Sequence, residues 1–417
     1  METMQVVASV LFALALLHTF STKFFEHLAH CHPHHAGVFH LLAEVEIVFG
    51  VWAMVLVVFM ISMLGKHDAM AYLDGQNFTE PLFVFAIMVV AASKPVLQAA
   101  SWCVLAVTRW IPLPRPLAFF LTCMTLVPIL GSFITEPAAM TLAALLLKDT
   151  VFAQAPRRLQ YAALGTLFVN ISIGGTLTPF AAPPVLMVAS KWGLDMEYML
   201  THIGWKAALA VFISTTIMTI AFAPDIKRMK IASQSPYTGV PFWMVLLHLL
   251  FMVGIVVFSH HPAAFMGIFL LFMGVATAYP TFQNPLILRE GLLVAFFLGG
   301  LVVLGGMQQW WLQPLLMGMS ADSVYFGAIA LTAVTDNAAL TYLASLVEGL
   351  SPEFQYALLT GAVTGGGLTI IANAPNPAGA SILKSTFHEG AISPIGLLAG
   401  AALPTLIAML CFRLLPF

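Results

Sequence analysis

The sequence predicts an all-α polytopic membrane protein with about ten to twelve transmembrane passages, folded as two inverted-topology repeats. Three observations support this fold class: a very apolar composition, long apolar runs along the whole chain, and two pairs of similar segments. Of 417 residues, 60% are hydrophobic and 8% are charged, whereas an ordinary soluble domain has roughly 25% charged residues. The apolar runs are about 16 to 25 residues long, which is close to the length that crosses a hydrocarbon core about 30 Å thick.

Charge and cysteine content limit the partners and the chemistry. The net charge of −2 provides no concentrated basic surface, so nucleic acid is not an expected partner. Most of the 4 cysteines lie in or near apolar runs, where we expect small buried side chains and not a disulfide framework. Residues 5–20 have no basic residue before them and no small-residue cleavage site. We therefore expect a retained helix there and not a signal peptide.

The two halves of the chain contain similar segments in the same order. Residues 135–146 (TEPAAMTLAALL) match residues 335–346 (TDNAALTYLASL) at an offset of 335 − 135 = 200. Residues 174–190 (GGTLTPFAAPPVLMVAS) match residues 365–381 (GGGLTIIANAPNPAGAS) at an offset of 365 − 174 = 191. Shared acid, Gly-Gly, Leu-Thr and Pro positions do not follow from apolar composition alone. We therefore interpret the halves as a duplication, which is common in transporters.

Each repeat is predicted to contain a re-entrant hairpin and a discontinuous helix. The hairpins are expected at residues 117–147 and 323–346, with their tips at the matching Thr-acid pairs. The helix breaks are expected within residues 174–184 and 365–377, because Gly loses much entropy on ordering and Pro removes an amide donor. Unwound backbone at membrane depth is tolerated only where it is buried in protein or lines a wet cavity. The breaks are therefore the expected substrate site.

Basic residues predict the orientation, because Lys and Arg in short loops favour the cytoplasmic side. If both hairpins are re-entrant, the 16 basic residues divide into 11 on one side, 4 on the other and Lys94 within a helix. Both chain termini are then predicted outside. The loop at 148–160 is basic and the matching loop at 347–355 is acidic, which indicates inverted repeats. The 11 residues are Lys23, Arg109, Arg115, Lys148, Arg157, Arg158, Lys227, Arg228, Lys230, Arg289 and Lys384.

The predicted organisation has four parts. N-terminal helices and a His-rich loop occupy residues 1–80, and the first inverted repeat occupies residues 81–222. A basic cytoplasmic linker follows at residues 223–239. The second inverted repeat, with its preceding helices, occupies residues 240–417.

The second hairpin tip, Thr335-Asp336-Asn337, carries the first candidate site residues. A charged side chain inside a membrane costs about 2.5 to 3.5 kcal/mol on insertion scales. Hydroxyl, carboxylate and amide oxygens are the hard ligands that a sodium ion prefers. We predict that these three side chains bind an ion and that Asp336 is the acid that exchanges it for a proton. The alternative is that Asp336 and Thr335 only cap a helix.

The matching tip is Thr135-Glu136-Pro137, in which proline offers no side-chain ligand. Burial raises the pKa of a carboxyl group and a nearby cation lowers it, so one buried acid can hold either a proton or a sodium ion. Glu136 is predicted to be a second titrating group or a structural partner of Lys94, and both Glu136 and Thr135 are predicted ion-binding residues. Lys94 lies in an otherwise apolar run, where it either pairs with Glu136 or extends its ammonium group to the membrane surface.

The broken helices provide four further candidates: Thr178, Thr369, Asn373 and Asn376. The threonines occupy equivalent positions after the glycines, and the asparagines occur in the second half only. Free carbonyls at a helix break bind cations, and half-helix N-termini face anions. These four side chains are predicted either to bind the ion directly or to satisfy the broken backbone.

Six histidines and Cys31 crowd residues 27–40, between the first two long helices. Such a tract can bind a transition metal or respond to pH. Its spacing fits no compact zinc pattern, so a solvated interfacial loop is the favoured interpretation. No metal site and no cofactor are predicted.

Residues 170–184 (NISIGGTLTPFAAPP) and 334–341 (VTDNAALT) resemble motifs of an ion-transporter superfamily. This superfamily contains bacterial sodium–proton antiporters, arsenite carriers and sodium-coupled dicarboxylate carriers. The first segment is similar to its Gly-Thr-Pro stretch on a discontinuous helix, and the second to the Asp-Asn motif of its antiporter and arsenite branches. The resemblance covers residues 81–417, and residues 40–50 (HLLAEVEIVFG) add a resemblance to a bacterial group of sodium–proton antiporters.

This resemblance implies a bacterial inner-membrane location, a homodimer and an elevator mechanism. The dicarboxylate branch has Ser-Asn-Thr at its hairpin tips, whereas this chain has an acid at both. Two unit charges about 4 Å apart repel by about 4 kcal/mol at an effective dielectric near 20, so a dicarboxylate is disfavoured there. The predicted function is secondary active sodium–proton antiport, with a small inorganic ion and the lipid bilayer as partners. The alternative is a sodium- or proton-coupled carrier of a carboxylate or an oxyanion.

Enzymatic activity is not predicted. The chain lacks His-Glu-x-x-His and shows no Gly-x-Gly-Asp or Gly-x-Ser-Gly arrangement, so intramembrane protease chemistry has no support. The two candidate acids, Glu136 and Asp336, also lie at expected helix breaks and not on intact helices. A purely structural role is disfavoured, because two interrupted helices in a membrane destabilise a fold that has no substrate.

Overall fold

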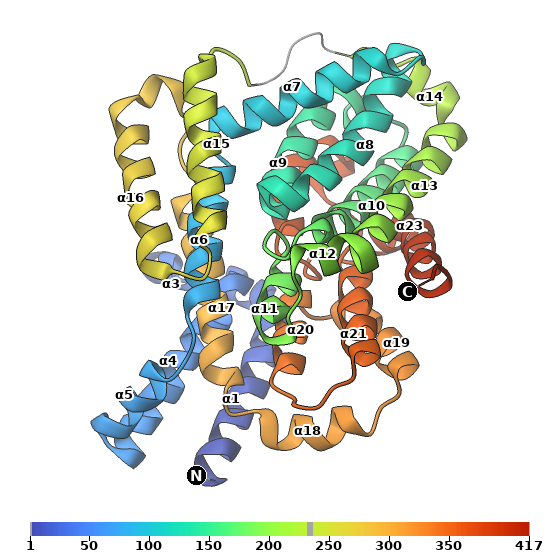
Figure 1. The fold of residues 1–417 in the computed structure, drawn as a ribbon. Coiled ribbons are helices and arrows are strands. Elements are labelled where there is room, and N and C mark those ends of the chain that lie inside the picture. Colours follow the sequence, from blue (N-terminus) through green and yellow to red (C-terminus); the bar gives the residue numbers. More distant parts are fainter. Residues whose placement is uncertain (1, 232–236, 417) are drawn as a thin grey trace.

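The computed structural model describes residues 2–231 and 237–416. Residues 232–236, in the predicted linker, lie outside the described residues. The described stretches are helical and contain no strand, which confirms the all-α prediction for them. Figure 1 shows two groups of packed helices side by side, one with α6, α15, α16 and α17 and the other around α8, α10 and α13.

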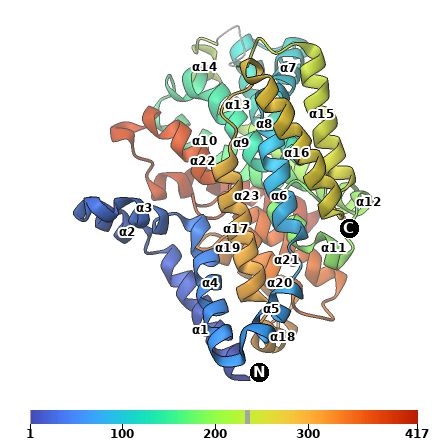
Figure 2. The same cartoon turned by 90° about the vertical axis from the view of Figure 1, so that its left-hand side faces the viewer.

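The N-terminal region consists of two long helices and a short helical hairpin. The helices are α1 (Glu2–Thr19), α2 (Thr22–Cys31), α3 (Ala36–Leu42), α4 (Val45–Leu64) and α5 (Lys66–Asp74). Helices α2 and α3 pack together and project from the side of the molecule (Figure 2). His18 anchors their base, because its Nδ1 accepts from Trp52 Nε1 at 3.1 Å and its Nε2 donates to Leu42 O at 2.9 Å. The His-rich tract is thus mostly helical, and the prediction of a loop there was wrong.

Helices α6 to α14 follow, and proline begins many of them. It occupies the first turn of α7, α8, α9 and α11, where its missing N–H has no intrahelical acceptor. The bounds are α6 (Thr79–Ala91), α7 (Lys94–Trp110), α8 (Arg115–Ile134), α9 (Glu136–Leu147), α10 (Arg157–Gly174), α11 (Pro183–Trp192), α12 (Met196–Tyr198), α13 (Trp205–Ala221) and α14 (Ala223–Lys227).

Helices α15 to α23 form the second part, and proline again occupies the first turn of α16, α21, α22 and α23. The bounds are α15 (Phe242–Val257), α16 (Pro262–Ala278), α17 (Leu288–Gly305), α18 (Gln309–Met317), α19 (Ala321–Thr332), α20 (Asn337–Ser345), α21 (Pro352–Gly365), α22 (Asn376–Leu383) and α23 (Pro394–Leu414).

Fewer helices than predicted have the length of a membrane span. In the described ranges, 6 are long and apolar enough: α1, α4, α8, α17, α23 and the joined segment Met196–Ala221. The pair α6 and α7, bent by 65°, makes up to 7 if it forms one span. Helices α15 and α16 are apolar but have only 16 and 17 residues. The count by length and composition is below ten, because breaks divide several apolar runs into short helices.

The two halves pack in a reciprocal way. Helix α8 packs against α10 in the first half, and α19 packs against α21 in the second. The helices that follow the breaks cross over, so that α11 packs against α20 and α22 packs against α9. This exchange is the arrangement expected of two related repeats, and it brings both breaks and both tips to the centre.

Glycines allow two helix pairs to approach closely. A Cβ on Gly300 of α17 would lie 2.4 Å from the backbone N of Gly50 in α4. A Cβ on Gly165 of α10 would lie 2.2 Å from the backbone N of Ala401 in α23. Small residues at helix crossings are typical of membrane proteins, in which close packing stabilises the association of helices.

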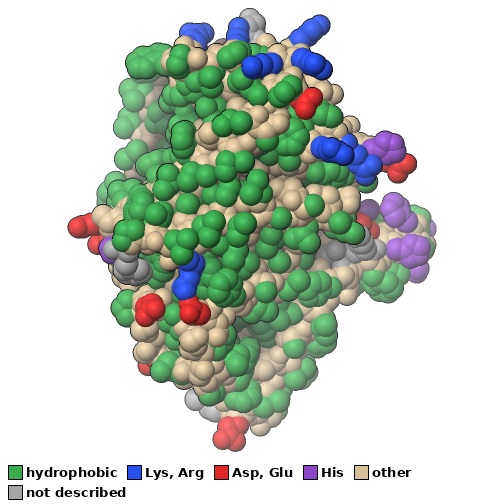
Figure 3. Space-filling model, turned by 90° about the vertical axis from the view of Figure 1, so that its right-hand side faces the viewer, with side chains coloured by type: hydrophobic (Ala, Val, Ile, Leu, Met, Phe, Trp, Pro, Cys, Tyr) green, Lys and Arg blue, Asp and Glu red, His purple; other side chains and the backbone are tan. Residues whose placement is uncertain are grey.

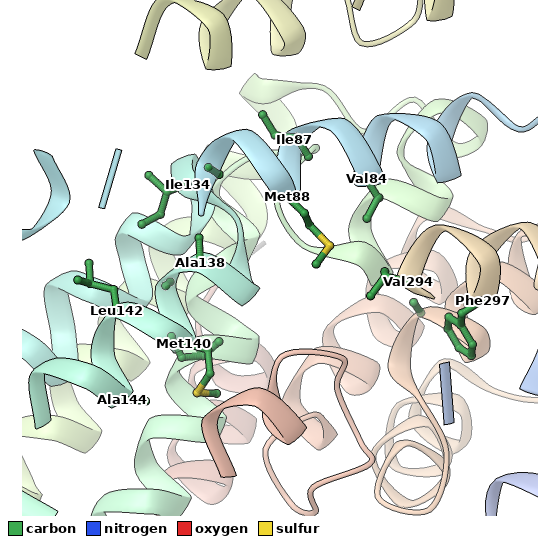
Figure 4. Packing of buried hydrophobic residues seen from close by; sticks show 14 of the residues in the cluster. Val84, Ile87, Met88, Ile134, Ala138, Met140, Leu142, Ala144, Val294 and Phe297 are labelled. Atoms are coloured by element: carbon green, nitrogen blue, oxygen red, sulfur yellow. The ribbon is translucent and has the colours of Figure 1, made fainter. Parts of the chain in front are cut away.

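Apolar side chains fill the space between the two groups of helices. Figure 4 shows Met88 of α6 between α9, represented by Ala138 and Met140, and α17, represented by Val294. The face of the molecule in Figure 3 is mainly hydrophobic, with Lys and Arg gathered at the top. In Figure 1 the top carries the turn between α7 and α8 together with α14, and the N-terminus lies at the bottom. A broad apolar surface of this kind suits contact with lipid.

We expect Gly300→Ala to destabilise the fold, because the added methyl group overlaps backbone atoms of Phe49 and Gly50 and overpacking costs about 1 to 3 kcal/mol. Thermal unfolding in detergent, followed by tryptophan fluorescence, should move to a lower temperature. Gly274→Ala in α16 is the matched control, since no atom lies within 4 Å of its Cβ position. Equal melting temperatures for the two variants would contradict the expectation.

Candidate functional site

The first tip is a sharp turn between two packed helices. Helix α8 ends at Ile134, and α9 starts at Glu136. Between them Thr135 has φ 71° and ψ 151°, a backbone conformation that costs a non-glycine residue about 1 to 3 kcal/mol. The Glu136 side chain is fully buried. The turn therefore places a carboxylate inside the protein at the positive end of α9.

Ser132 and Thr178 connect this tip to the first helix break. Ser132 Oγ donates to Gly174 O at 2.7 Å and accepts from Leu177 N at 2.8 Å. Thr178 Oγ1 donates to Ser132 O at 2.5 Å. Two backbone groups freed by the break thus find partners on the hairpin, which a buried break requires.

The second tip is held differently. Asp336 caps α20, because one carboxylate oxygen accepts from Ala338 N at 2.8 Å and from Ala339 N at 3.1 Å. Thr335 Oγ1 donates to Leu331 O of its own helix at 2.8 Å. Asn337 N donates to Ala372 O at 3.1 Å. The position of the Asp336 side chain therefore agrees with the alternative prediction, in which this residue caps a helix.

The second break meets both tips. Thr369 Oγ1 donates to Ala333 O, next to the second tip, at 2.9 Å. Asn373 Nδ2 donates to Glu136 Oε2, at the first tip, at 2.8 Å. Because Asn373 follows Ala372, the bond from Asn337 and the bond to Glu136 lie on consecutive residues. The unwound segment of the second half is thus the point where the two tips converge.

The Asn376 side chain donates to two backbone carbonyls within the second break. Its Nδ2 donates to Gly366 O at 2.7 Å and to Thr369 O at 2.9 Å. Two glycines lie against polar side chains at the breaks. A Cβ on Gly175 would lie 2.5 Å from Glu136 Oε1, and a Cβ on Gly366 would lie 2.1 Å from Ser172 Oγ. The Gly-Gly pairs shared by both halves allow this close approach of backbone to side chain.

Several buried polar atoms at the convergence have no hydrogen-bond partner among the described residues. They are Thr135 Oγ1, Glu136 Oε1, Asn337 Oδ1 and Nδ2, Asn373 Oδ1 and Asn376 Oδ1. An unpaired buried polar group costs about 1 to 3 kcal/mol, and such groups are rare in folded proteins. Five of these six atoms are oxygens, and one belongs to a carboxylate. The six atoms belong to five residues, which we call the oxygen cluster: Thr135, Glu136, Asn337, Asn373 and Asn376.

The oxygen cluster contains five of the nine predicted ion-binding residues. Asp336 lies close enough to Glu136 for the two charges to interact, but its role at the end of α20 is that of a cap. The hydroxyl groups of Thr178, Thr369 and Thr335 donate to backbone carbonyls. For Thr178 and Thr369 this is the alternative in which the side chains satisfy the broken backbone.

Two other predicted features lie outside the cluster. Lys94 starts α7 at the bend after α6, and no carboxylate lies within 4 Å of its ammonium among the described ion pairs. No group of three potential metal ligands occurs in the described ranges. In the His-rich helices, His27 Nε2 and Cys31 Sγ approach to 3.5 Å.

Sequence reasoning did not identify Ser132 and Ser172 as part of the site. Ser132 bridges the first tip and the first break, and Ser172 donates to Val363 O of the second half at 2.7 Å. A signal was present for Ser132, because Thr332 occupies the matching position at the offset of 200 and also carries a hydroxyl group. Ser172 faces Val363 in the alignment of the breaks, so the duplication gave no signal for it.

These features define a polytopic helical membrane protein whose halves bring a buried carboxylate, amides and unwound backbone to one point. Residues 3–415 match the model of a family described as "Putative Na+/H+ antiporter". The chain belongs to this family, and the match includes the N-terminal helices. No curated protein matches the chain significantly.

We expect Ser132→Ala to destabilise the hairpin and its break, because it leaves Gly174 O and Leu177 N without their partner. The expected loss is about 1 to 3 kcal/mol, measured as a lower melting temperature in detergent. Ser62→Ala is the control, since the Ser62 hydroxyl donates only to Val58 O on an exposed surface. A melting temperature equal to that of the control would show that the bridge is unimportant.

Proposed function

We propose that the chain is a secondary active transporter that exchanges sodium ions for protons at the oxygen cluster. The observation that carries this proposal is the set of fully buried oxygens without partners around the carboxylate of Glu136. Oxygen ligands from carboxylate, amide and hydroxyl groups suit a hard cation. Membership of a family described as sodium–proton antiporters supports the same two exchanged ions, sodium and the proton.

Glu136 is the exchanging acid in this proposal, which reverses the roles expected from the sequence. Its Oε2 accepts from Asn373, whereas its Oε1 has no partner. A proton therefore goes to Oε1, where it leaves the bond from Asn373 intact. A sodium ion takes the same place at Oε1 and adds the hydroxyl of Thr135 and the amide oxygens of Asn337 and Asn373. One oxygen cannot hold both, so binding of either ion releases the other.

Asp336 is a second carboxylate that attracts the cation without binding it. Its bonds to Ala338 N and Ala339 N hold the start of α20, while its charge acts on Glu136. An anionic substrate is disfavoured by the same two charges. The second candidate function is a sodium- or proton-coupled carrier of a carboxylate or an oxyanion such as arsenite. It is less favoured because these two charges repel an anion.

The proposal extends to the arrangement of the halves. The reciprocal packing of α9 with α22 and of α11 with α20 supports two inverted repeats. The basic end around α7 and α14, opposite the N-terminus in Figure 1, supports a cytoplasmic location for that end and an outside N-terminus. The group of α6, α15, α16 and α17 is the scaffold in an elevator mechanism, and the group with both breaks is the moving block. A homodimer and a bacterial inner-membrane location remain predictions.

We expect Glu136→Gln to abolish exchange, because glutamine provides neither a proton site nor a charge. The measurement uses purified protein in liposomes with an acidic interior and a pH-sensitive dye, to which sodium, lithium or potassium salts are added. Asp336→Asn should keep exchange with an apparent sodium affinity weaker by about ten-fold, the effect of a unit charge about 10 Å away at a dielectric near 20.

Glu353→Gln is the matched control, because Glu353 is an exposed acid in the first turn of α21. Full exchange by Glu136→Gln would refute the role of this acid. Loss of exchange in Asp336→Asn with full exchange in Glu136→Gln would instead restore the assignment expected from the sequence. Absence of any cation-driven proton movement in the unmodified protein would refute antiport itself.

A further inference from the structure

Two cavities lie beside the helix that follows the first break. The larger has a volume of about 550 Å³ and extends between α6, α11, α12 and the turn between α15 and α16. The smaller has a volume of about 370 Å³ and lies between α6, α11 and α20. Both far exceed the roughly 10 to 15 Å³ that one water molecule needs. The two cavities share the residues Glu80 and Ser190.

The larger cavity lies between the two groups of helices seen in Figure 1. Glu80 and His260 come from the side of α6, α15 and α16, whereas Pro179, Phe180 and Asp195 come from the side of the first break. The two carboxylates have no Lys or Arg beside them in the lining of this cavity. The larger cavity therefore carries acidic side chains, which concentrate cations, while Lys191 lines the smaller cavity together with Glu80.

The inner wall of this cavity adjoins the oxygen cluster. Pro179 and Phe180 line the cavity, and Thr178, the residue before them, donates to Ser132 O. Ser132 lies three residues before Thr135, whose buried hydroxyl has no partner. The first break and the first tip thus connect the lining of this cavity to the cluster.

Glu80 is the acid in this cavity that is free to attract an ion. Asp195 caps α12, since its Oδ1 accepts from Tyr198 N at 2.7 Å. Glu80 Oε1 accepts from Asn77 Nδ2, in a bond of 3.2 Å, and Glu80 lines both cavities. His260 is close enough to interact with its charge.

We infer that the larger cavity is the entry port of the transported cation and that Glu80 is a second, outer cation site within it. This inference rests on the proposed function, because it takes the cluster around Glu136 as the destination of the ion. The ligand class is a small hydrated monovalent cation. Glu80 acts by raising the local cation concentration and does not take part in the exchange itself.

The charge of the cavity can be measured without any transport. Ser259 lines the larger cavity and is half-buried, so Ser259→Cys provides a reporter thiol in full-length protein from which exposed Cys31 and Cys103 have been removed. The rates of its reaction with a positively and a negatively charged methanethiosulfonate reagent are compared. The positive reagent should react faster. Glu80→Gln should lower this preference by about five-fold, the effect of one unit charge about 7 Å away in water after some screening.

The controls separate charge from folding. Glu197→Gln removes an exposed acid near the cavity that does not line it, and the preference should stay unchanged. Glu80→Asp keeps the charge and should keep the preference. The inference is overturned if the reagents react equally in the parent protein, or if Glu80→Gln and Glu197→Gln give the same preference.

A transport assay provides the second measurement. In liposomes, Glu80→Gln should raise the sodium concentration for half-maximal exchange by about two-fold, because the same electrostatic effect acts here on one cation and not on the ratio of two oppositely charged reagents, and leave the maximal rate unchanged. An unchanged half-maximal concentration would overturn the role of Glu80 while the parent protein still exchanges ions. Failure of the proposed function appears differently, as absence of exchange in the parent protein, and it leaves the labelling result intact.

Discussion

Unwound backbone in the interior of a membrane protein must find polar partners, and this requirement organises the centre of the molecule. Each break takes its partners from a hairpin tip: Ser132 bonds to both sides of the first break, and Ala333 accepts from Thr369 of the second. Since lipid offers no hydrogen bonds, a tip cannot leave its break without leaving these groups unpaired. Break and tip therefore belong to one rigid unit, and any movement during transport has to carry them together.

The same requirement explains the composition of the matching segments. Glycine at 175 and 366 lets backbone approach Glu136 and Ser172 more closely than any side chain would allow. Proline starts α9, α11 and α22 without losing a needed hydrogen bond. The hydroxyl and amide side chains between them replace the lost helical bonds. The motifs are thus explained first by the geometry of broken helices, and the buried oxygens without partners among the described residues are what that geometry leaves unexplained.

The matching segments therefore predicted which parts of the chain lie together better than they predicted the contacts of each residue. Matching segments indicated that tips and breaks belong together, and the packing of α9 with α22 and of α11 with α20 agrees with that. Which acid is a cap depends on tertiary contacts that no alignment of the halves contains. Asp336 faces two free amides of its own helix, whereas Glu136, followed by proline, meets Asn373 from the other half. By length and composition, 6 described helices, or up to 7 with the bent pair, could each be a span, since an apolar run in the sequence does not show where a helix bends or breaks.

The acids at the two tips have different surroundings. One oxygen of Asp336, Oδ1, accepts from both amides at the start of α20, whereas Glu136 at the first residue of α9 is fully buried and its Oε1 has no partner among the described residues. In the proposed exchange, the ionised Glu136 must be held in a medium that disfavours charge between the departure of a cation and the arrival of a proton. The positive end of α9 and the amide of Asn373 are the groups that stabilise it. In the proposed exchange, this difference between the two tips is what lets a single carboxylate, that of Glu136, alternate between two ions.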